Sequence, residues 1–425
     1  MKFGKHMTAV GLVSLVAIAA SACGSGSAAA SGSPVVIDVF SPFSGPNAFI
    51  GNQYNLPPVS LAAKLINQDG GVLGHKVQVI TTDSGQDVGD AVSAANKLFA
   101  QYPNLNGEVG ITSDVASAVV PLFNTHKIPM MSLAGNEALD KSHYTYFYRV
   151  ASPDSLQGAA MAQAALKLGY KTAAILMDNS GSTQSNVPAL VKAYERHGGK
   201  VVVNLALASD QSSYRTEVEK VAAAHPQVIF TETDPQTAAT LFANMKQLGI
   251  LGIPTIGGQE VDVPAYFQAV ANAVGGYSVE DKFLRVSVFT ASKTPGFPYF
   301  QQEWNKIEPK KDGPAGPIQG ATYDAANILA LAMDAAHSTN PTVYVKYIRK
   351  VTDNPSGQVV TNYAQGAKLL KEGKQISYQG AVGPLKFNQY NWPTEGFDLF
   401  KLNASGKLVP MFHQPGASVA NFYLH

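Results

Sequence analysis

The amino-acid sequence predicts an α/β protein with two lobes, each a doubly wound parallel sheet. Short runs of β-branched and other apolar residues alternate with helical runs of about 10 to 15 residues, which is the pattern of parallel sheets. The alternation runs through two successive series, so two sheets are expected. With 425 residues, of which 45% are hydrophobic and 14% charged, the chain is long and apolar enough for two or three packed domains.

Residues 1–22 have the layout of a secretory signal peptide. Lys2 and Lys5 precede an apolar run over 8–20, and small residues come directly before Cys23, the single cysteine. The apolar run is shorter than the roughly 20 residues of a membrane-spanning helix. A cysteine at this position resembles the lipobox of bacterial lipoproteins, in which the thiol receives a diacylglycerol. Cys23 is therefore the expected lipidation site, with ordinary secretion and cleavage at a nearby alanine as the alternative.

Residues 23–33 are expected to form a flexible tether, because 24–33 consist only of Gly, Ser and Ala. We expect the protein outside the cytoplasm as a lipid-anchored monomer, in the periplasm or at the outer face of the plasma membrane. A single cysteine allows no intramolecular disulfide, so the core must supply the stability. The formal net charge of +1 and the lack of a basic run argue against nucleic acid as a partner.

The first series of elements starts at residue 35. Its expected strands are 35–40, 76–80, 109–111 and 128–131, and its expected helices are 54–68, 91–102 and 115–125. Leu61, Leu65 and Ile66 recur at helical spacing in the first of these helices, and the glycines within 70–74 end it.

The second series spans 172–248. Its expected strands are 172–177, 201–205 and 228–231, and its expected helices are 187–197, 213–224 and 235–248. Glycines that follow Leu168, His197 and Leu248 mark helix ends. Beyond this series we expect strands at 283–288, 383–387, 397–402 and 407–412, and helices at 321–336 and 343–351. Strands that follow two complete series indicate that the chain crosses between the lobes more than once.

Several motifs, in order and at matching spacing, point to a known family. They are SGPNA at 44–48, INQDGGVLGHKV at 66–77 with Asp83, IPMMS at 128–132, Arg149 through Gln157 and Gly158, YDAA at 323–326, and YQG at 378–380 with Gly383 and Phe387. Together they resemble the type I periplasmic-binding-fold receptors of ABC importers, in the leucine-binding-protein-like group for branched-chain amino acids and amides. The resemblance covers nearly the whole mature chain.

The resemblance implies a two-lobe clamp, or Venus flytrap, joined by three hinge strands. Lobe one would take 34–148 and 284–382, and lobe two would take 149–283 and 383–425. A small polar solute, such as an amino acid or an amide, would bind in the cleft. The closed form would then be presented to the transmembrane subunits of an ABC permease. The resemblance implies no cofactor, no metal and no catalysis.

The turn at 112–114 is the first candidate for ligand contact. It follows an expected strand and opens an expected helix, where hydroxyl and free N–H groups suit an anionic group such as a carboxylate. The resemblance implies this use and points to Ser113. Plain N-capping by Ser113 or Asp114 is the alternative.

A second lobe-one turn carries Ala134, Gly135 and Asn136. The resemblance implies main-chain contacts to the solute here, with Asn136 in place of the family's hydroxyl group; an ordinary loop asparagine is the alternative. Asn47 and Phe49 precede the first helix and would add a hydrogen bond and a stacking face at the cleft mouth. Loop packing is the alternative for Phe49.

Lobe two supplies Thr183, Thr233 and Glu260, which all follow expected strands. The resemblance places an acidic residue for the ligand ammonium at Gln259 or Glu260, depending on a one-residue alignment choice. The aromatic residues that the family often carries in the 179–184 and 231–234 loops are absent, which puts a standard amino-acid site in doubt.

The candidate cleft is acidic. Asp114, Asp234 and Glu260 would favour a cationic, amide or polyhydroxylated ligand, and solvated loop charge is the alternative.

Two other functions are alternatives to the role of a solute-binding protein in import. An enzyme is disfavoured, because the sequence has no HExxH, Walker A or GxSxG motif, its nine histidines lack metal-ligand spacing, and its only cysteine lies in the leader. A ligand sensor of the same fold, which signals to a membrane partner, is the second alternative. Transport is favoured over sensing because the sequence shows no output domain.

Overall fold

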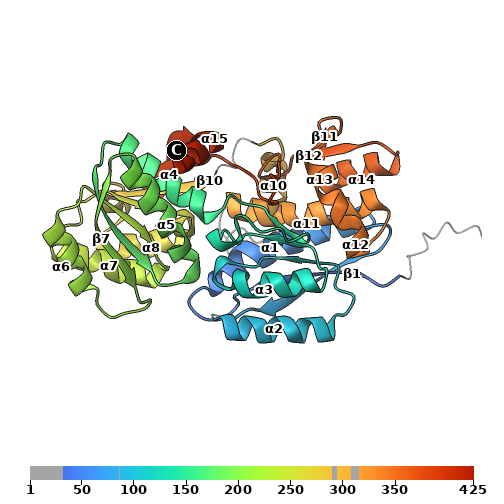
Figure 1. Cartoon of the computed structure of the whole chain (residues 1–425), viewed down its shortest axis with the longest axis horizontal. Helices are drawn as coiled ribbons and strands as arrows, with labels where there is room; N and C mark the ends of the chain where they lie inside the picture. Colours follow the sequence, from blue (N-terminus) through green and yellow to red (C-terminus); the bar gives the residue numbers. More distant parts are fainter. Residues whose placement is uncertain (1–31, 86, 290–293, 308–314) are drawn as a thin grey trace, which may run out of the picture. The chain divides into compact units, whose positions relative to one another are not determined.

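The computed structural model describes residues 32–85, 87–289, 294–307 and 315–425. Residues Gly32–His425 form one compact unit. The expected signal peptide at 1–22, Cys23 and nearly all of the tether lie outside the described residues. The described residues form an α/β fold with two main sheets, as the sequence predicts (Figure 1). Among them, no helix is both long enough and apolar enough to cross a membrane.

The first sheet has five parallel strands, in the order β2-β1-β3-β4-β5 among the described residues. They are β1 (Val35–Ser41), β2 (Val77–Asp83), β3 (Gly107–Val109), β4 (Met130–Ser132) and β5 (Phe147–Arg149). Val35, Ile37 and Val39 on one face of β1 are buried in the core, and so is Phe40 on the other face. Burial on both faces is what a parallel sheet covered by helices requires, which explains the nearly continuous apolar run of β1.

We call the first sheet and its helices lobe one. Four long helices pack beside the strands or one another: α1 (Leu56–Gln68), α2 (Val88–Gln101), α3 (Ser113–Thr125) and α11 (Pro317–Ala336) (Figure 1). The shorter elements are α10 (Phe297–Trp304), α12 (Pro341–Tyr344), α13 (Ile348–Thr352), α14 (Tyr363–Lys371), and the paired strands β11 (Gln358–Val360) and β12 (Ile376–Tyr378). A π-helical turn, η1 (Ile50–Asn55), leads into α1, and the 3₁₀ turns are η2 (Glu137–Leu139) and η4 (Val345–Tyr347).

The second sheet, with its helices, forms lobe two. Its order among the described residues is β14-β13-β10-β9-β8-β6-β7. The strands are β6 (Thr172–Asp178), β7 (Lys200–Leu207), β8 (Val228–Glu232), β9 (Thr255–Gly257), β10 (Leu284–Phe289), β13 (Phe397–Leu402) and β14 (Leu408–Gln414). Strands β6 to β10 pair in parallel, whereas β13 and β14 add an antiparallel hairpin at one edge.

The helices of lobe two pack beside these strands or one another, and those between β6 and β10 connect successive parallel strands. They are α4 (Asp154–Lys167), α5 (Gly181–Arg196), α6 (Arg215–Ala224), α7 (Pro235–Gln247), α8 (Pro264–Val274), α9 (Tyr277–Glu280) and α15 (Gly416–Leu424), with the 3₁₀ turn η3 (Gln259–Val261) after β9. Helix α4 packs against both α5 and the C-terminal α15 (Figure 1). Several of these helices start near the carboxyl end of a strand, so the loops at that edge can form a site.

The chain passes between the sheets three times, after β5, after β10 and after β12. This agrees with the expectation of repeated crossing. The predicted boundary at residue 284 assigns β10 to lobe one, but β10 pairs with β9 and β13 of the second sheet. Pairing with distant strands decides where this segment belongs, and local sequence does not show it. The other lobe boundaries remain a prediction.

Two further segments differ from the sequence prediction. The strand expected at 383–387 is wrong: only isolated bridges form, from Gln379 to Pro384 and from Phe387 to Pro393. Pro384 has no N–H to donate, and Gly383 has a φ of +94°, outside the strand region. The helix expected at 343–351 forms as α12, η4 and α13, with a 3₁₀ turn in its middle.

Candidate functional site

A small cavity of about 70 Å³ lies where the turns after β3 and β4 of lobe one meet the loops of lobe two. The residues that line it are Phe49, Ile50, Tyr54, Thr112, Ser113, Leu133, Asp154, Gln157, Ser182, Asn186, Glu232, Gln259, Glu260 and Ile318. None of these residues carries a positive charge, whereas three are acids. The cavity therefore offers a solute more hydrogen-bond acceptors than cationic partners.

Ser113, the first residue of α3, is the centre of the lobe-one wall. Its hydroxyl Oγ accepts a hydrogen bond of 2.9 Å from the Gly135 backbone N–H and donates one of 2.9 Å to Asp154 Oδ2. A side chain at position 135 would collide with Asp154, because a Cβ atom there would lie 1.9 Å from Asp154 Oδ1. Ser113, Gly135 and Asp154 therefore form one packed arrangement.

Asp154 begins α4 and joins the two lobes at the cavity. Besides Ser113, the Ser185 hydroxyl of α5 donates to Asp154 Oδ2. Burial raises the pKa of Asp154 to about 6 from its ordinary value of 3.8, although hydrogen bonds from Ser185 and Ser113 oppose this shift. Asp154 is thus a half-buried carboxyl group whose pKa is raised toward neutral pH.

Glu232, at the end of β8, is the most enclosed acid of the cavity. Oε1 accepts from Gln157 Nε2 at 2.7 Å and from the Glu260 N–H at 3.0 Å, and Oε2 accepts from Asn186 Nδ2 at 2.6 Å. Burial, with a further contribution from the charge of Asp154, raises the pKa of Glu232 to about 8.

Glu260 lies in η3, and its backbone N–H donates to Glu232 Oε1. Burial first, and then the negative charge of Glu232, raise the pKa of Glu260 well above its ordinary range. Two adjacent carboxyl groups in a partly enclosed site favour a bound proton or a cationic partner.

Asp114 makes a second link between the lobes. Its Oδ1 accepts a hydrogen bond of 2.9 Å from the Ser182 N–H in the first turn of α5. The free N–H groups of a helix N-terminus attract a carboxylate, which accounts for the pairing. Gly181 suits this close approach, since a Cβ atom at position 181 would lie only 3.3 Å from the Asp114 Cα atom.

Aromatic and aliphatic side chains close the rest of the cavity. The rings of Phe49 and Tyr54 meet edge to face, with centroids 5.9 Å apart. The Tyr54 hydroxyl donates to the Asp262 carbonyl of lobe two at 3.1 Å. Ile318, in the first turn of α11, is buried and lines the cavity from lobe one.

Of the nine predicted ligand contacts, Ser113, Phe49 and Glu260 line this cavity. Ala134 and Gly135 lie in the turn behind Ser113, to which Gly135 is hydrogen-bonded.

Asn136 caps η2 and donates from Nδ2 to the Ser113 carbonyl at 3.1 Å, so it supports the same turn. Thr183 is fully buried and donates to Asp178 Oδ1 at 2.6 Å. Thr233 is buried, and neither it nor the half-buried Asn47 is among the residues that line the cavity.

Sequence reasoning did not select Asp154, Glu232, Tyr54 and Asn186 as contacts. Asp154 lies inside the motif that runs from Arg149, and Glu232 directly follows the strand expected at 228–231, so both had a signal in the sequence. Tyr54 and Asn186 lie within helical segments, where local sequence gives no sign that they face a cavity. In the described part of the chain, no group of His, Cys, Asp and Glu side chains is arranged to hold a metal ion.

A family model described as periplasmic binding protein matches residues 34–406. The Leu/Ile/Val-binding protein homolog 3 of Brucella melitensis is 24% identical over 402 residues, which cover 94% of this chain and 98% of that protein.

Two solved structures show the same fold. One is the leucine-binding protein LivK of Thermotoga maritima, with a TM-score of 0.72, 19% identity, and coverage of 90% of this chain and 99% of that chain. The other is the branched-chain amino acid substrate-binding protein LivJ of Streptococcus pneumoniae in complex with isoleucine, with a TM-score of 0.71, 17% identity and the same coverage. The family match supports a substrate-binding role outside the cytoplasm. The chain thus belongs to the periplasmic binding protein family, and its fold is the type I fold of leucine-binding proteins.

Proposed function

We propose that this protein captures a small polar solute, an amino acid or an amide-like compound, and delivers it to the permease of an ABC importer. A lipid on Cys23 would hold it at the membrane. The observation that carries the proposal is the cavity, where Ser113 of lobe one meets Asp154 and Glu260 of lobe two. The relatives named as Leu/Ile/Val-binding proteins support an amino acid or a related solute.

The proposed contacts combine this geometry with the prediction from the sequence. Ser113 and Glu260 would contact the polar end of the solute, and Asn136 would hold the turn beside it. Ala134, Gly135, Thr183 and Thr233 would contribute around them, with Asn47 and Phe49 at the mouth. Because the cavity has acids and no basic side chain among its described lining, a solute with an ammonium or amide N–H group suits it best.

Ligand-dependent thermal stability tests the binding function. A ligand at 100 times its Kd adds about 2.7 kcal/mol to the native state. We expect one chemical class, in a panel of amino acids, amides, urea, polyamines and small aromatic acids, to raise the melting temperature by several degrees. If every compound in the panel leaves it unchanged, the proposed solute class is wrong.

Uptake distinguishes transport from sensing. In cells that lack the gene, import of the radiolabelled solute should fall and should return when the gene is restored. If binding is intact but uptake does not depend on the gene, a sensor that signals to a membrane partner becomes the better explanation.

A further inference from the structure

Two acidic residues lie inside the sheet of lobe one, on two of its inner strands. Asp38 of β1 and Glu108 of β3 are partners in the parallel register, and both residues are fully buried. Neighbouring strands lie about 4.8 Å apart, and side chains in register point to the same face. The two carboxyl groups are therefore neighbours in the interior, where acids are rarely found without a partner.

The pair lies in an apolar row of the sheet. Ile80 of β2 is opposite Asp38, and Met130 of β4 is opposite Glu108. Helices α2 and α3 lie beside this face (Figure 1), and their apolar side chains, Phe123 among them, form a buried cluster with Met130. In surroundings of this kind, two adjacent carboxyl groups cannot both ionise without a large cost in free energy.

Each acid has one paired oxygen and one unpaired oxygen. The Thr82 hydroxyl donates to Asp38 Oδ1 at 2.9 Å, and the Ile111 N–H donates to Glu108 Oε1 at 3.0 Å. Asp38 Oδ2 and Glu108 Oε2 are buried and have no hydrogen-bond partner among the described residues. One proton between these two oxygens would satisfy both, because a protonated carboxyl group donates to a carboxylate.

The electrostatic setting favours such a proton. Burial raises the pKa of Asp38 to about 7, although the hydrogen bond from Thr82 opposes this shift. Burial first, and then the charge of Asp38, raise the pKa of Glu108 well above its ordinary range. The pair therefore keeps a proton at a pH at which isolated carboxyl groups have lost theirs.

Other charged side chains around the pair are exposed or have different partners. Those on β2, β5, α2 and α3 are Asp83, Asp90, Lys97, Asp114 and Arg149. The first three are exposed, Asp114 accepts the hydrogen bond from Ser182, and Arg149 pairs with Asp140 at 2.6 Å. Neither positive group of this described set forms an ion pair with Asp38 or Glu108.

Glu108 also holds the turn that leads to the candidate binding cavity. Its Oε1 accepts the Ile111 N–H, while the Ser132 hydroxyl donates to the Ile111 carbonyl at 2.8 Å. Side chains thus fix both polar groups of the Ile111 backbone. Gly110, with a φ of +112°, lets the chain turn at this point. Ser113, two residues after Ile111, lines the cavity.

We propose that Asp38 and Glu108 share one proton, and that Glu108, held in this pair, is a positioning residue for the turn that carries Ser113. Loss of the proton to a base in the solvent would leave two adjacent carboxylates. Their repulsion would move Glu108 away from the Ile111 N–H and loosen the turn. The role of this turn in solute binding rests on the proposed function, whereas the shared proton can be measured without a solute.

Two substitutions of Glu108 separate its hydrogen bonds from its bulk. Glu108→Gln keeps an acceptor for the Ile111 N–H and offers Asp38 a donor that does not titrate. Glu108→Met has a similar length and provides neither function. Met130→Leu is the matched control, because Met130 is the buried neighbour of Glu108 in the same row. The control should behave like the original protein in every measurement.

Infrared spectroscopy of the unliganded protein at pH 8 tests the shared proton. We expect the Glu108→Gln variant to lose about one carboxyl group's share of the C=O band of protonated acids, because Asp38 ionises beside the amide. Glu232 and Glu260 also contribute to this band, so the quantity measured is the difference between variant and original.

Hydrogen exchange of the Ile111 amide tests the turn. The original protein and Glu108→Gln should protect this amide equally, whereas Glu108→Met should exchange it about tenfold faster through loss of one hydrogen bond. If melting curves show that Glu108→Met is unfolded, the original and Glu108→Gln are compared at alkaline pH. Only the original can lose the shared proton, so only its exchange, corrected for the intrinsic rate, should accelerate.

Titration calorimetry with a solute found in the panel tests the effect on the site. Affinity should change by less than about twofold in Glu108→Gln and fall about tenfold in Glu108→Met. An infrared band that Glu108→Gln leaves unchanged overturns the shared proton. Equal Ile111 exchange in the Gln and Met variants, or equal solute affinity, overturns the positioning role, and the binding function stands in each of these cases. If no compound binds, the binding function and the role of the turn in it both fail, while the infrared and exchange results still decide whether the pair exists.

Discussion

Ser113 and Asp154 face each other across the boundary of the two lobes, and the Ser113 hydroxyl donates to Asp154 Oδ2 at 2.9 Å. The same hydroxyl accepts the N–H of Gly135. One small side chain thus fixes the turn after β4 and meets the first residue of α4. A contact of this kind stabilises the lobe arrangement seen here and places the acid at the cavity.

Substitution of Ser113 by alanine should lower the free energy of unfolding by about 1–3 kcal/mol, because the buried N–H of Gly135 loses its acceptor and Asp154 loses a donor. Urea denaturation of the unliganded protein measures this. Ser93→Ala on the exposed side of α2 is the control and should change stability by less than about 0.5 kcal/mol. Equal effects of the two substitutions would show that the Ser113 contacts do not contribute.

Combined substitution of Ser113 and Asn136 by alanine should weaken solute binding by about 2–4 kcal/mol, at roughly 1–2 kcal/mol for each contact. Ser113 is expected to act directly, whereas Asn136 holds the turn through its hydrogen bond to the Ser113 carbonyl. Titration calorimetry with the solute found in the panel gives the change. Asn340→Ala removes a similar cap, at the start of α12, and should leave affinity unchanged. Unaltered affinity in the double variant would remove both residues from the site.

Replacement of Cys23 by serine should release the protein from the membrane, since serine offers no thiol to acylate. We expect the variant in the soluble extracytoplasmic fraction and the unsubstituted protein in the membrane fraction, where it incorporates labelled fatty acid. Ser21→Ala, two residues earlier, keeps a small side chain and the thiol and should remain membrane-bound. Equal fractionation of the Cys23→Ser variant and the unsubstituted protein would exclude the lipid anchor.

Local patterns were enough to predict most of the fold. The strand expected at 397–402 coincides with β13, and the helix expected at 115–125 forms within α3. Apolar periodicity and helix-ending glycines are local properties, so the sequence displays them directly. The strand expected at 383–387 does not form, and the sequence already indicated this through Pro384, whose missing N–H prevents regular pairing.

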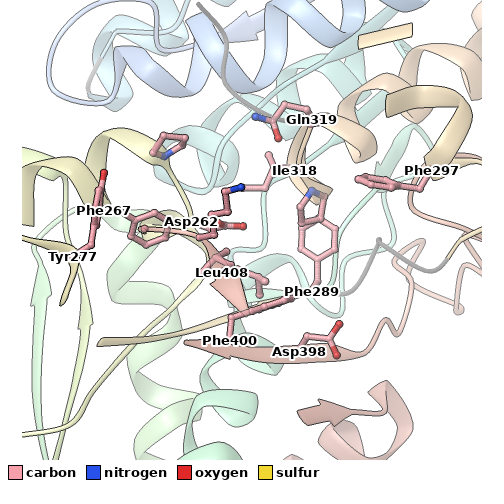
Figure 2. Close-up of a pocket in the computed structure, with 17 residues that line it drawn as sticks. Asp262, Phe267, Tyr277, Phe289, Phe297, Ile318, Gln319, Asp398, Phe400 and Leu408 are labelled. Carbon is pink, nitrogen blue, oxygen red and sulfur yellow. The ribbon is translucent and has the colours of Figure 1, made fainter. Parts of the chain in front are cut away.

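The site was predicted only in part, for a physical reason. Ser113 and Glu260 follow strands, and the carboxyl ends of parallel strands gather at one edge, so local order was enough to find them. Asp154 and Asn186 meet the cavity because helices α4 and α5 dock against a distant lobe. A larger cavity of about 430 Å³ likewise brings together Phe297 and Phe400 from opposite lobes (Figure 2). Such contacts depend on tertiary packing, which the periodicity of apolar residues in the sequence does not show.

The unliganded protein should lose stability as pH rises from about 4.5 to 8, because of its buried acids. Burial raises the pKa of Glu232 from 4.5 to about 8. Between these values the folded state holds a proton that the unfolded state has released, so the free energy of unfolding falls as pH rises. This loss of stability is absent below the pKa of Glu232 in the unfolded state and complete above its pKa in the folded state. Asp154 adds to it between 3.8 and about 6.

Replacement of Glu232 by glutamine isolates this effect. The amide is uncharged, so it should match the original protein at pH 4.5 and exceed it at pH 8 by an amount on the order of 3 kcal/mol. Urea denaturation at pH 4.5, 6 and 8 measures the difference. Glu219→Gln is the control, because Glu219 is exposed and forms only a surface pair with Arg215. Parallel pH profiles for the Glu232→Gln variant and the original protein would mean that Glu232 is not protonated more readily in the folded state. A rise in stability at pH 8 with a loss of affinity for an amine would instead identify an acid that destabilises the empty protein in order to bind a cation.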